Sequence, residues 1–159
     1  MIKEFEPIIQ GILTMVTEWE PKLLELSQTV IMERRNSQNR TIKQILGHLI
    51  DSASNNTHRI VHLQYQESPF YFPNYASNGN NDRWIAIQNY QDEHWNTLIQ
   101  LWKYANQHIV HVIKNINPLK LDNQWIAGEG RHIPLRSMTT DYLRHLKLHL
   151  DEIDELLHG

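Results

Sequence analysis

The sequence contains no cysteine among its 159 residues. Without a thiol the chain can form no disulfide, no zinc site built on thiolates and no cysteine nucleophile. An excess of positive charge is missing as well, since 15 Lys and Arg against 18 Asp and Glu give a formal net charge of −3. This mildly acidic balance lacks the basic surface by which proteins bind nucleic acid, so we expect no nucleic-acid partner.

Long hydrophobic runs are also absent. No apolar stretch approaches the ~18 residues that a membrane span needs. Residues 1–7 carry acidic side chains where an export signal would be apolar. We therefore expect no membrane partner and a cytoplasmic location. The length suits about one domain, and no shift in composition divides it, so residues 1–159 are expected to form a single domain.

Apolar residues recur at helical spacing along four long segments. Thr41 and Gln44 form a capping-box pattern at the start of the second segment. Pro21 lies inside the first segment and is expected to kink or restart that helix. The four predicted helices span residues 3–34, 41–64, 84–115 and 137–157.

Two long connections separate the later helices. The first, 66–82, is rich in Pro, Asn, Gly and aromatic residues. The second, 117–136, contains Trp125 and the Gly128–Gly130 triplet and is predicted to form a small hairpin. Connections of this length are uncommon inside a compact domain and are often functional. The expected fold is therefore all-α, a four-helix bundle with two long crossover loops.

Histidine is unusually frequent, with ten residues in the chain. Two pairs have the i, i+4 spacing that places both rings on one helix face, His58 with His62 and His145 with His149. On a helical wheel, His149 lies in the middle of the apolar stripe of its helix and His145 lies at the edge. His58 and His62 lie opposite the apolar stripe of their helix and are expected in solvent.

Two imidazoles on the inner face of a bundle are costly to bury unless their ring nitrogens are satisfied. A metal ion satisfies them, and so do carbonyl or carboxylate groups of a core, so the pattern leaves both open. A third metal ligand should come from another helix. His48 is the candidate, because it heads a polar row that forms either a solvated flank or the lining of a cleft. That row consists of His48, Ser52, Asn55 and Arg59.

Two familiar metal motifs are excluded. His145 and His149 have the spacing of a zincin helix, but Leu146 stands where that mechanism needs a glutamate base. Di-iron bundles need Glu-x-x-His pairs that face inward from two helices. Here Glu129–His132 lies in a glycine-rich loop and Glu155–His158 lies at the chain end.

Three segments of the chain carry recognisable motifs. Gly47–Ser52 (GHLIDS) lies in the second predicted helix and Asp141–Ile153 (DYLRHLKLHLDEI) in the fourth, and residues 75–90, which include the run NNDRW, lead into the third. Together these segments resemble the DinB-like superfamily, and the resemblance covers essentially the whole chain. Each motif is short, so its specificity comes from the three histidines, which occur in the same order on the same helices.

The resemblance implies a four-helix bundle, often a homodimer, with a three-histidine site for one divalent metal ion such as zinc or nickel. His48, His145 and His149 would be the ligands. Relatives often carry a further histidine beside the last ligand, where this chain has Leu148 and Leu150. Neighbouring positions on a helix point in other directions, so this departure leaves the three-histidine set intact.

The resemblance further implies a metal-dependent enzyme that acts on a small molecule, as a hydrolase or as a thiol-dependent S-transferase. Characterised relatives include transferases that use low-molecular-weight thiols and a thiol-dependent maleylpyruvate isomerase. Three imidazoles leave one coordination position open. The nucleophile would therefore be a metal-bound water or thiolate, with no side chain assigned. The residues also leave open a non-catalytic binding or interaction protein with a structural metal or with none.

Other side chains are expected to support this site. The candidates for orienting the imidazole rings lie near them along the helices, with solvent exposure as the alternative for each carboxylate: Asp51, Ser52, Asp141 and Glu152. The candidates for the substrate pocket are Asn55, Arg59, Tyr75 and Trp84. The aromatic run 70–75 is expected either to cap the cleft or to cover the bundle end. Arg59 and Arg131 either bind an acidic substrate or thiol carboxylate, or are solvated.

Overall fold

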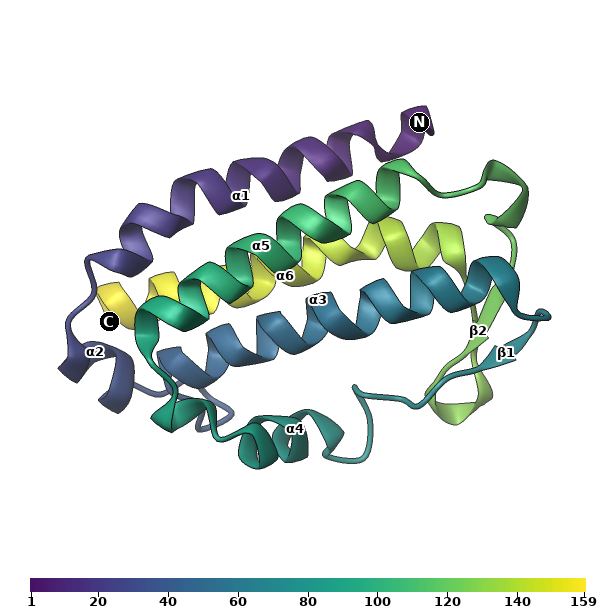
Figure 1. Cartoon of the computed structure of the whole chain (residues 1–159). Helices are drawn as coiled ribbons and strands as arrows, with labels where there is room; N and C mark the ends of the chain where they lie inside the picture. Colours follow the sequence, from purple (N-terminus) through teal and green to yellow (C-terminus); the bar gives the residue numbers. More distant parts are fainter.

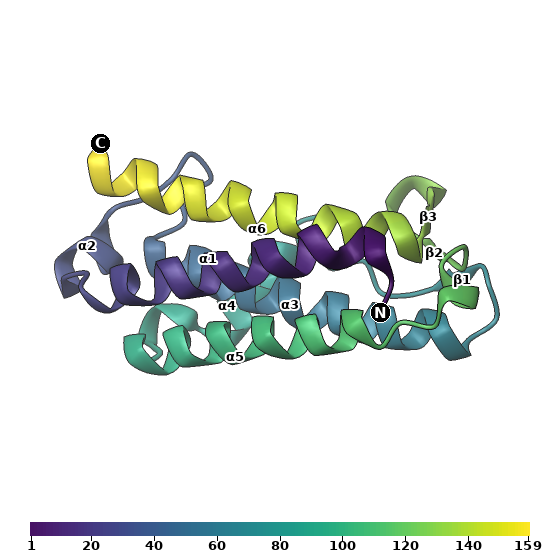
Figure 2. The same cartoon turned by 90° about the horizontal axis from the view of Figure 1, so that it is seen from above.

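Four long helices form a bundle in the computed structural model, which describes residues 1–159. Helix α3 packs against α5 and α6, and α1 packs against the same two helices. Helices α1 and α3 are therefore diagonal partners, as Figure 1 and Figure 2 show from two directions. The bounds are α1 Glu6–Leu24, α3 Ile42–Tyr65, α5 Trp95–Lys114 and α6 Leu135–His158.

Shorter elements connect the four helices. Two are further α-helices, α2 Gln28–Glu33 and α4 Asn80–Gln88. Four are single 3₁₀ turns, η1 Lys3–Phe5, η2 Tyr90–Asp92, η3 Pro118–Lys120 and η4 Gly128–Gly130. Three are short strands, β1 Phe70–Tyr71, β2 Gln124–Ile126 and β3 His132–Pro134.

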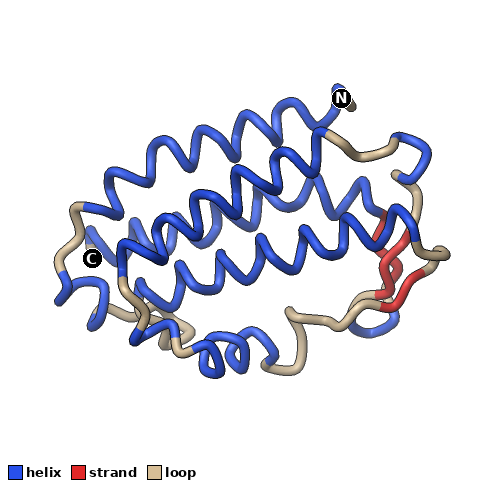
Figure 3. The backbone as a smooth tube through the Cα atoms, viewed as in Figure 1, coloured by secondary structure: helices blue, strands red, loops and turns tan.

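The two long connections meet in a small sheet at one end of the bundle, drawn in red in Figure 3. Strands β2 and β3 pair antiparallel, which confirms the predicted hairpin. Strand β1, from the first connection, pairs parallel with β2, so that Phe70 lies opposite Trp125. The four-helix class with two long connections is confirmed, and the sheet is an addition to it.

The first helix is shorter than predicted. Helix α1 continues through Pro21 and ends at Leu24 instead of residue 34. The Ser27 hydroxyl then accepts a hydrogen bond from the Val30 backbone N–H at 3.3 Å and begins α2. Serine at this position satisfies a free N–H of a new helix, so the chain starts again in a different direction.

The third predicted helix, 84–115, is interrupted. Helix α4 ends at Gln88, before Asn89, whose φ of 50° is left-handed, and α5 begins only at Trp95. Between them Tyr90 turns into the core, and its hydroxyl donates to Asp51 Oδ1 at 2.6 Å. Asparagine tolerates this backbone conformation better than most residues, so the break falls where its cost is small.

The start of α3 matches its prediction. The Thr41 hydroxyl accepts from the Gln44 backbone N–H, and the Gln44 side chain accepts from the Thr41 backbone N–H. These two bonds satisfy donors that a helix start otherwise leaves free.

A hydrophobic core extends from α3 through the whole bundle. The largest fully buried side chains of this core include Trp102, Phe5, Ile9, Ile12, Leu23, Ile31, Leu46 and Leu49. None of the helices combines the length and apolarity that a membrane crossing requires.

Gly47 allows the Tyr90 ring to lie against α3, because a Cβ atom there would overlap the ring carbons. The hydrogen bond to Asp51 prevents the ring from moving aside. Gly47→Ala is therefore expected to destabilise the protein by roughly 1–3 kcal/mol, the usual range for overpacking a core. Gly11→Ala is the control, because its Cβ would meet only the movable end of Leu143. Urea unfolding should show a clear loss for Gly47→Ala alone, and equal stability of the two variants would contradict this reading.

Candidate metal centre

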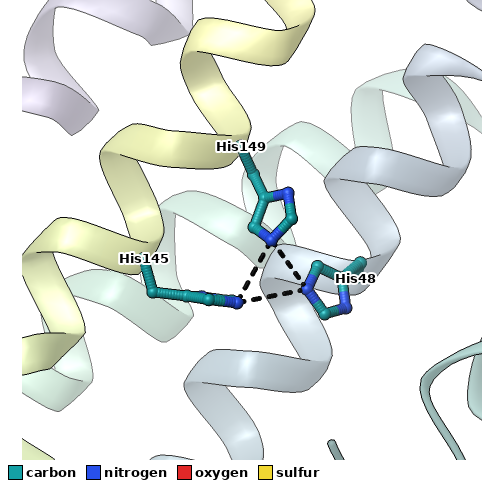
Figure 4. A group of neighbouring side chains, drawn as sticks. All are labelled: His48, His145 and His149. Atoms are coloured by element: carbon teal, nitrogen blue, oxygen red, sulfur yellow. Dashed lines mark hydrogen bonds between the residues drawn. The ribbon is translucent and has the colours of Figure 1, made fainter. Parts of the chain in front are cut away.

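Three histidines from two helices converge at the middle of the bundle. His48 comes from α3, and His145 and His149 come from consecutive turns of α6 (Figure 4). Their Nε2 atoms lie 3.1 Å apart for His48 and His149, 3.1 Å for His145 and His149, and 3.4 Å for His48 and His145. The rings meet edge to face. Three nitrogen atoms therefore face one point.

The helices position these rings by their packing. The i, i+4 spacing places His145 and His149 on the face of α6 that packs against α3. His48 is 2% exposed and His149 is 6% exposed, whereas His145 is half-buried. The sequence thus places three imidazoles in the core of the bundle, where their ring nitrogens require partners.

A carboxylate fixes the tautomer of His149. Its Nδ1 lies 3.0 Å from Glu152 Oε2, and because a carboxylate only accepts, Nδ1 carries the proton. The lone pair of Nε2 is then directed at the other two rings. Glu152 is held in turn by Asn36, whose Nδ2 donates to the same oxygen at 3.0 Å.

Hydroxyl groups lie beside the other two rings. Tyr75 Oη is 2.6 Å from His48 Nδ1 and 3.4 Å from the His48 carbonyl oxygen, to which it donates. Ser52 Oγ is 3.4 Å from His145 Nδ1. All three Nδ1 atoms therefore have an oxygen atom that can accept their proton, and this arrangement leaves all three Nε2 lone pairs facing inward.

Two of the rings are neutral at physiological pH because their pKa values are depressed. Burial, followed by the neighbouring His149 and His145, lowers the pKa of His48 to about 2. Burial, followed by His149, lowers the pKa of His145 to about 4. Metal ligands must be deprotonated, so these shifts prepare both imidazoles to bind a cation.

The donor set fits a divalent metal ion. Three inward lone pairs at this distance repel one another unless a cation lies between them. Tetrahedral zinc with Zn–N bonds of about 2.0–2.1 Å would separate its nitrogen ligands by about 3.3–3.4 Å, close to the separations found here. His48, His145 and His149 are the only cluster of three or more potential ligands in the chain, and no fourth protein ligand joins them. Structural zinc sites have four protein ligands, whereas catalytic sites keep one position open.

A cavity of about 790 Å³ opens beside the histidines. His48 and His145 line it directly, together with Ser52 and Tyr75. The volume lies within the range of about 300–1,000 Å³ that is typical of small-molecule sites. Its further lining includes Arg59, Asn74, Trp125, Arg131, Met138 and Asp141.

The structure separates the predicted ring-orienting residues into two groups. Glu152 and Ser52 lie beside His149 and His145, as described above. Asp51 bonds no histidine, because its Oδ1 accepts from the Tyr90 hydroxyl and from the Gln88 side-chain amide. Asp141 pairs with Arg144 one turn along α6, on the rim of the cavity.

The predicted pocket residues separate in the same way. Arg59 and Tyr75 line the cavity. Asn55 does not, because its Nδ2 donates to the Asp51 carbonyl inside the helix. Trp84 is 39% exposed and packs edge-on against Tyr75, outside the lining.

The aromatic segment 70–75 and the second histidine pair meet at the sheet. Tyr71 is exposed, whereas Phe70 packs on the ring of His62. His58 is exposed, as predicted, but His62 is half-buried, because β1 folds back over the end of α3.

Sequence reasoning missed Asn36, which holds Glu152 from a loop 116 residues away. The polar run 34–40 carries no signal beyond that of a loop. The hydrogen bond between Tyr75 and His48 was missed too, since it depends on the path of the long connection. Glu152 itself was predicted to orient a histidine ring, because it lies three residues after His149 on the same helix.

Glu152→Gln is expected to weaken zinc binding by about 10–100-fold, the usual effect of removing a carboxylate that orients a metal-binding histidine. The amide is uncharged and can present its N–H₂ instead of an acceptor to His149 Nδ1. Competition against a zinc chelator measures the change. Asp154→Asn is the matched control, because Asp154 contacts only the exposed His158 on the same helix. Equal affinities for all three proteins would show that Glu152 does not support the ring.

No protein-family model matches the sequence, and no curated protein matches it. Structural comparison finds YfiT from Bacillus subtilis, a probable metal-dependent hydrolase with an unusual four-helix bundle topology. It aligns with a TM-score of 0.80 and 16% identity, over 98% of this chain and 87% of YfiT.

A mycothiol-dependent maleylpyruvate isomerase aligns with a TM-score of 0.75 and 13% identity over 94% of this chain. A mutant of that isomerase, in which one histidine is replaced by alanine, aligns with a TM-score of 0.74. This chain spans 60% of the length of the isomerase. The resemblance seen in the histidine motifs is thereby confirmed at the level of architecture. The chain has the same four-helix fold as YfiT and the isomerase.

Proposed function

We propose that this chain is a metal-dependent enzyme that acts on a small molecule. His48, His145 and His149 hold one divalent metal ion, zinc or nickel, and the substrate enters the adjacent cavity. The observation that carries this proposal is the convergence of three Nε2 atoms at the wall of an open cavity, with no fourth protein ligand. YfiT, of similar fold, is a probable metal-dependent hydrolase.

A divalent ion bound there would lower the pKa of a water or thiol at its open position toward neutrality and so supply a nucleophile. The chain's own residues prepare the position. Glu152 keeps the proton of His149 on Nδ1, and Tyr75 and Ser52 can do the same for the other rings. The surrounding core excludes water from the inner side of the cluster, so only the cavity side is open.

Two reactions are consistent with this arrangement. In hydrolysis the nucleophile is water. In S-transfer it is a low-molecular-weight thiol that enters as a co-substrate, because the chain has no cysteine. The similar isomerase is mycothiol-dependent, which supports the second reaction, and YfiT supports the first.

The test compares two small electrophiles, p-nitrophenyl acetate and 1-chloro-2,4-dinitrobenzene, with zinc-loaded and nickel-loaded protein. Each is assayed with and without added cysteine or glutathione. Metal-dependent turnover without thiol supports a hydrolase, and turnover that requires thiol supports a transferase. Metal-loaded protein that turns over neither substrate, and that unfolds on chelation, supports a non-catalytic protein with a structural metal and overturns the proposal.

A further inference from the structure

Arg59 is a buried cation that no anionic group of the protein neutralises. The residue is only 6% exposed, yet it forms no ion pair with Asp or Glu. Its one polar contact is from Nη1 to the sulfur of Met138, at 4.0 Å. Nε is buried without any hydrogen-bond partner. A guanidinium with five N–H donors therefore has no oxygen acceptor in the protein.

Aromatic rings hold this guanidinium in place. Its Cζ lies 4.0 Å from the ring centre of Trp125, on β2, and 5.9 Å from that of Phe72. Burial lowers the pKa of Arg59 to about 10, so the group stays charged at neutral pH. Stacking on aromatic faces offsets only part of the cost of removing a charge from water. Such a residue is costly for stability, which is typical of a binding site.

The position of Arg59 connects it with the metal centre. Arg59, His48 and His145 line the same cavity. Met138, which Arg59 contacts, precedes His145 by seven residues on α6, about 10 Å along the helix axis. The guanidinium and the rings of His48 and His145 thus line different parts of one cavity.

We propose that Arg59 binds a carboxylate of the substrate, so that the substrate is an elongated organic acid. Its reacting group would lie at the histidines and its carboxylate roughly 10–16 Å away, the offsets along α6 and α3. This inference rests on the proposed function, because it assumes that chemistry occurs at the three histidines.

A carboxylate suits this end of the cavity better than a phosphate. One planar guanidinium matches the two oxygens of a carboxylate. A phosphate dianion needs more donors, but of the other two arginines in the lining Arg144 is paired with Asp141 and Arg131 is exposed to solvent. The Asp141 carboxylate also lines the cavity and repels a second negative charge.

Removal of the charge has a consequence that needs no substrate. Arg59→Met places an unbranched apolar side chain beside Trp125 and removes the unpaired cation. Its Tm should equal or exceed that of the wild type, because the protein loses a desolvated charge without losing a hydrogen bond to any of its own oxygens. A lower Tm would show that Arg59 serves the fold.

The direct test is calorimetric titration of zinc-loaded protein with hexanoate and with its uncharged analogue hexanamide. Arg59→Gln is expected to weaken hexanoate binding by about tenfold or more, as the loss of a charge-assisted hydrogen bond predicts, and Arg59→Lys by less. Hexanamide should bind the wild type and Arg59→Gln equally. Arg83→Gln is the control, because Arg83 is exposed, hydrogen-bonds only Asn78 and Asn80, and does not line the cavity.

Repeating the titration in His149→Ala separates this inference from the proposed function. Hexanoate binding that persists there and still depends on Arg59 supports the carboxylate site, even if the wild type takes up no zinc. Binding that is lost in His149→Ala but unchanged in Arg59→Gln places the carboxylate at the metal and overturns the inference alone. Absence of saturable hexanoate binding, or equal affinity for inorganic phosphate, would also overturn it.

Discussion

Saturating zinc is expected to raise the Tm of the metal-free protein by roughly 8–16 °C. A ligand at about 1,000 times its Kd stabilises the native state by about 4 kcal/mol. For a domain of this size, each 1 kcal/mol moves the Tm by roughly 2–4 °C. Zinc stabilises the native state because it removes the repulsion among three inward-facing Nε2 lone pairs, which lie close together only in that state. Thermal unfolding followed by circular dichroism, with and without zinc, measures the shift.

His149→Ala should abolish this shift, because it removes the ring that lies 3.1 Å from both other nitrogens. His58→Ala is the matched control. His58 also belongs to an i, i+4 histidine pair, but it is exposed on the outer face of α3. A zinc-induced shift that His58→Ala reduces as much as His149→Ala would indicate adventitious binding to surface histidines.

The metal-free protein is expected to lose stability in acid, with a slope that depends on three buried groups. In the native state the pKa of His48 is about 2 and that of His145 about 4, against 6.5 in the unfolded chain. Near pH 5 the unfolded chain therefore binds two protons at these sites and the native state binds almost none. Their contribution to stability is full above about pH 6.5 and declines as the pH falls toward their native pKa values.

Asp51 acts in the opposite direction. Burial raises its pKa from 3.8 to about 6, so near pH 5 the native state binds a proton that the unfolded chain does not. The difference for the three groups is then one proton, which corresponds to a loss of roughly 1.4 kcal/mol per pH unit. Removing either kind of group should change this slope in a defined way.

Asp51→Asn should steepen the slope to roughly 2.7 kcal/mol per pH unit, and His145→Ala should bring it close to zero. Urea unfolding of chelator-treated proteins between about pH 4.5 and about pH 5.5 measures all three slopes under the same conditions. Other carboxylates contribute equally to each protein, so the differences between slopes report on these groups. A slope unchanged in His145→Ala would show that His145 is not held neutral, and a slope unchanged in Asp51→Asn would show that burial does not raise the pKa of Asp51.

The metal cluster was predictable because it depends on regular helices. The positions of His145 and His149 on the apolar face of α6 follow from a period of 3.6 residues, and so does the position of Glu152 beside His149. The polar row that begins at His48 runs along α3 in the same way. Periodicity thus predicted the bundle and made the three histidines candidates, whereas their combination into one site came from the resemblance of the motifs to a known superfamily.

Irregular segments were harder to predict, since their contacts join residues distant in sequence. Asn36 reaches Glu152 from a loop, and Tyr75 reaches His48 from a long connection. The interruption at Asn89 depends on Tyr90 turning inward to Asp51 on α3, 39 residues earlier in the sequence. No local pattern encodes these pairings, because each one requires the tertiary arrangement first.

Arg59 shows the same limit for a binding residue. Its place in the polar row made it a candidate, but the row alone leaves a solvated flank and a cavity lining open. The decisive facts are the Trp125 ring at 4.0 Å and the absence of an oxygen acceptor, and both come from the fold of β2 over α3. Periodicity indicates the direction of this side chain, whereas packing determines its environment.

The most direct test of the metal centre is elemental analysis of protein purified without a histidine tag or a chelating column. We predict about one zinc or nickel ion per chain for the wild type, as a single three-histidine site requires, and none for His149→Ala. Wild-type protein that contains no metal, and that takes up neither zinc nor nickel on reloading, would contradict the proposal that His48, His145 and His149 form a metal site.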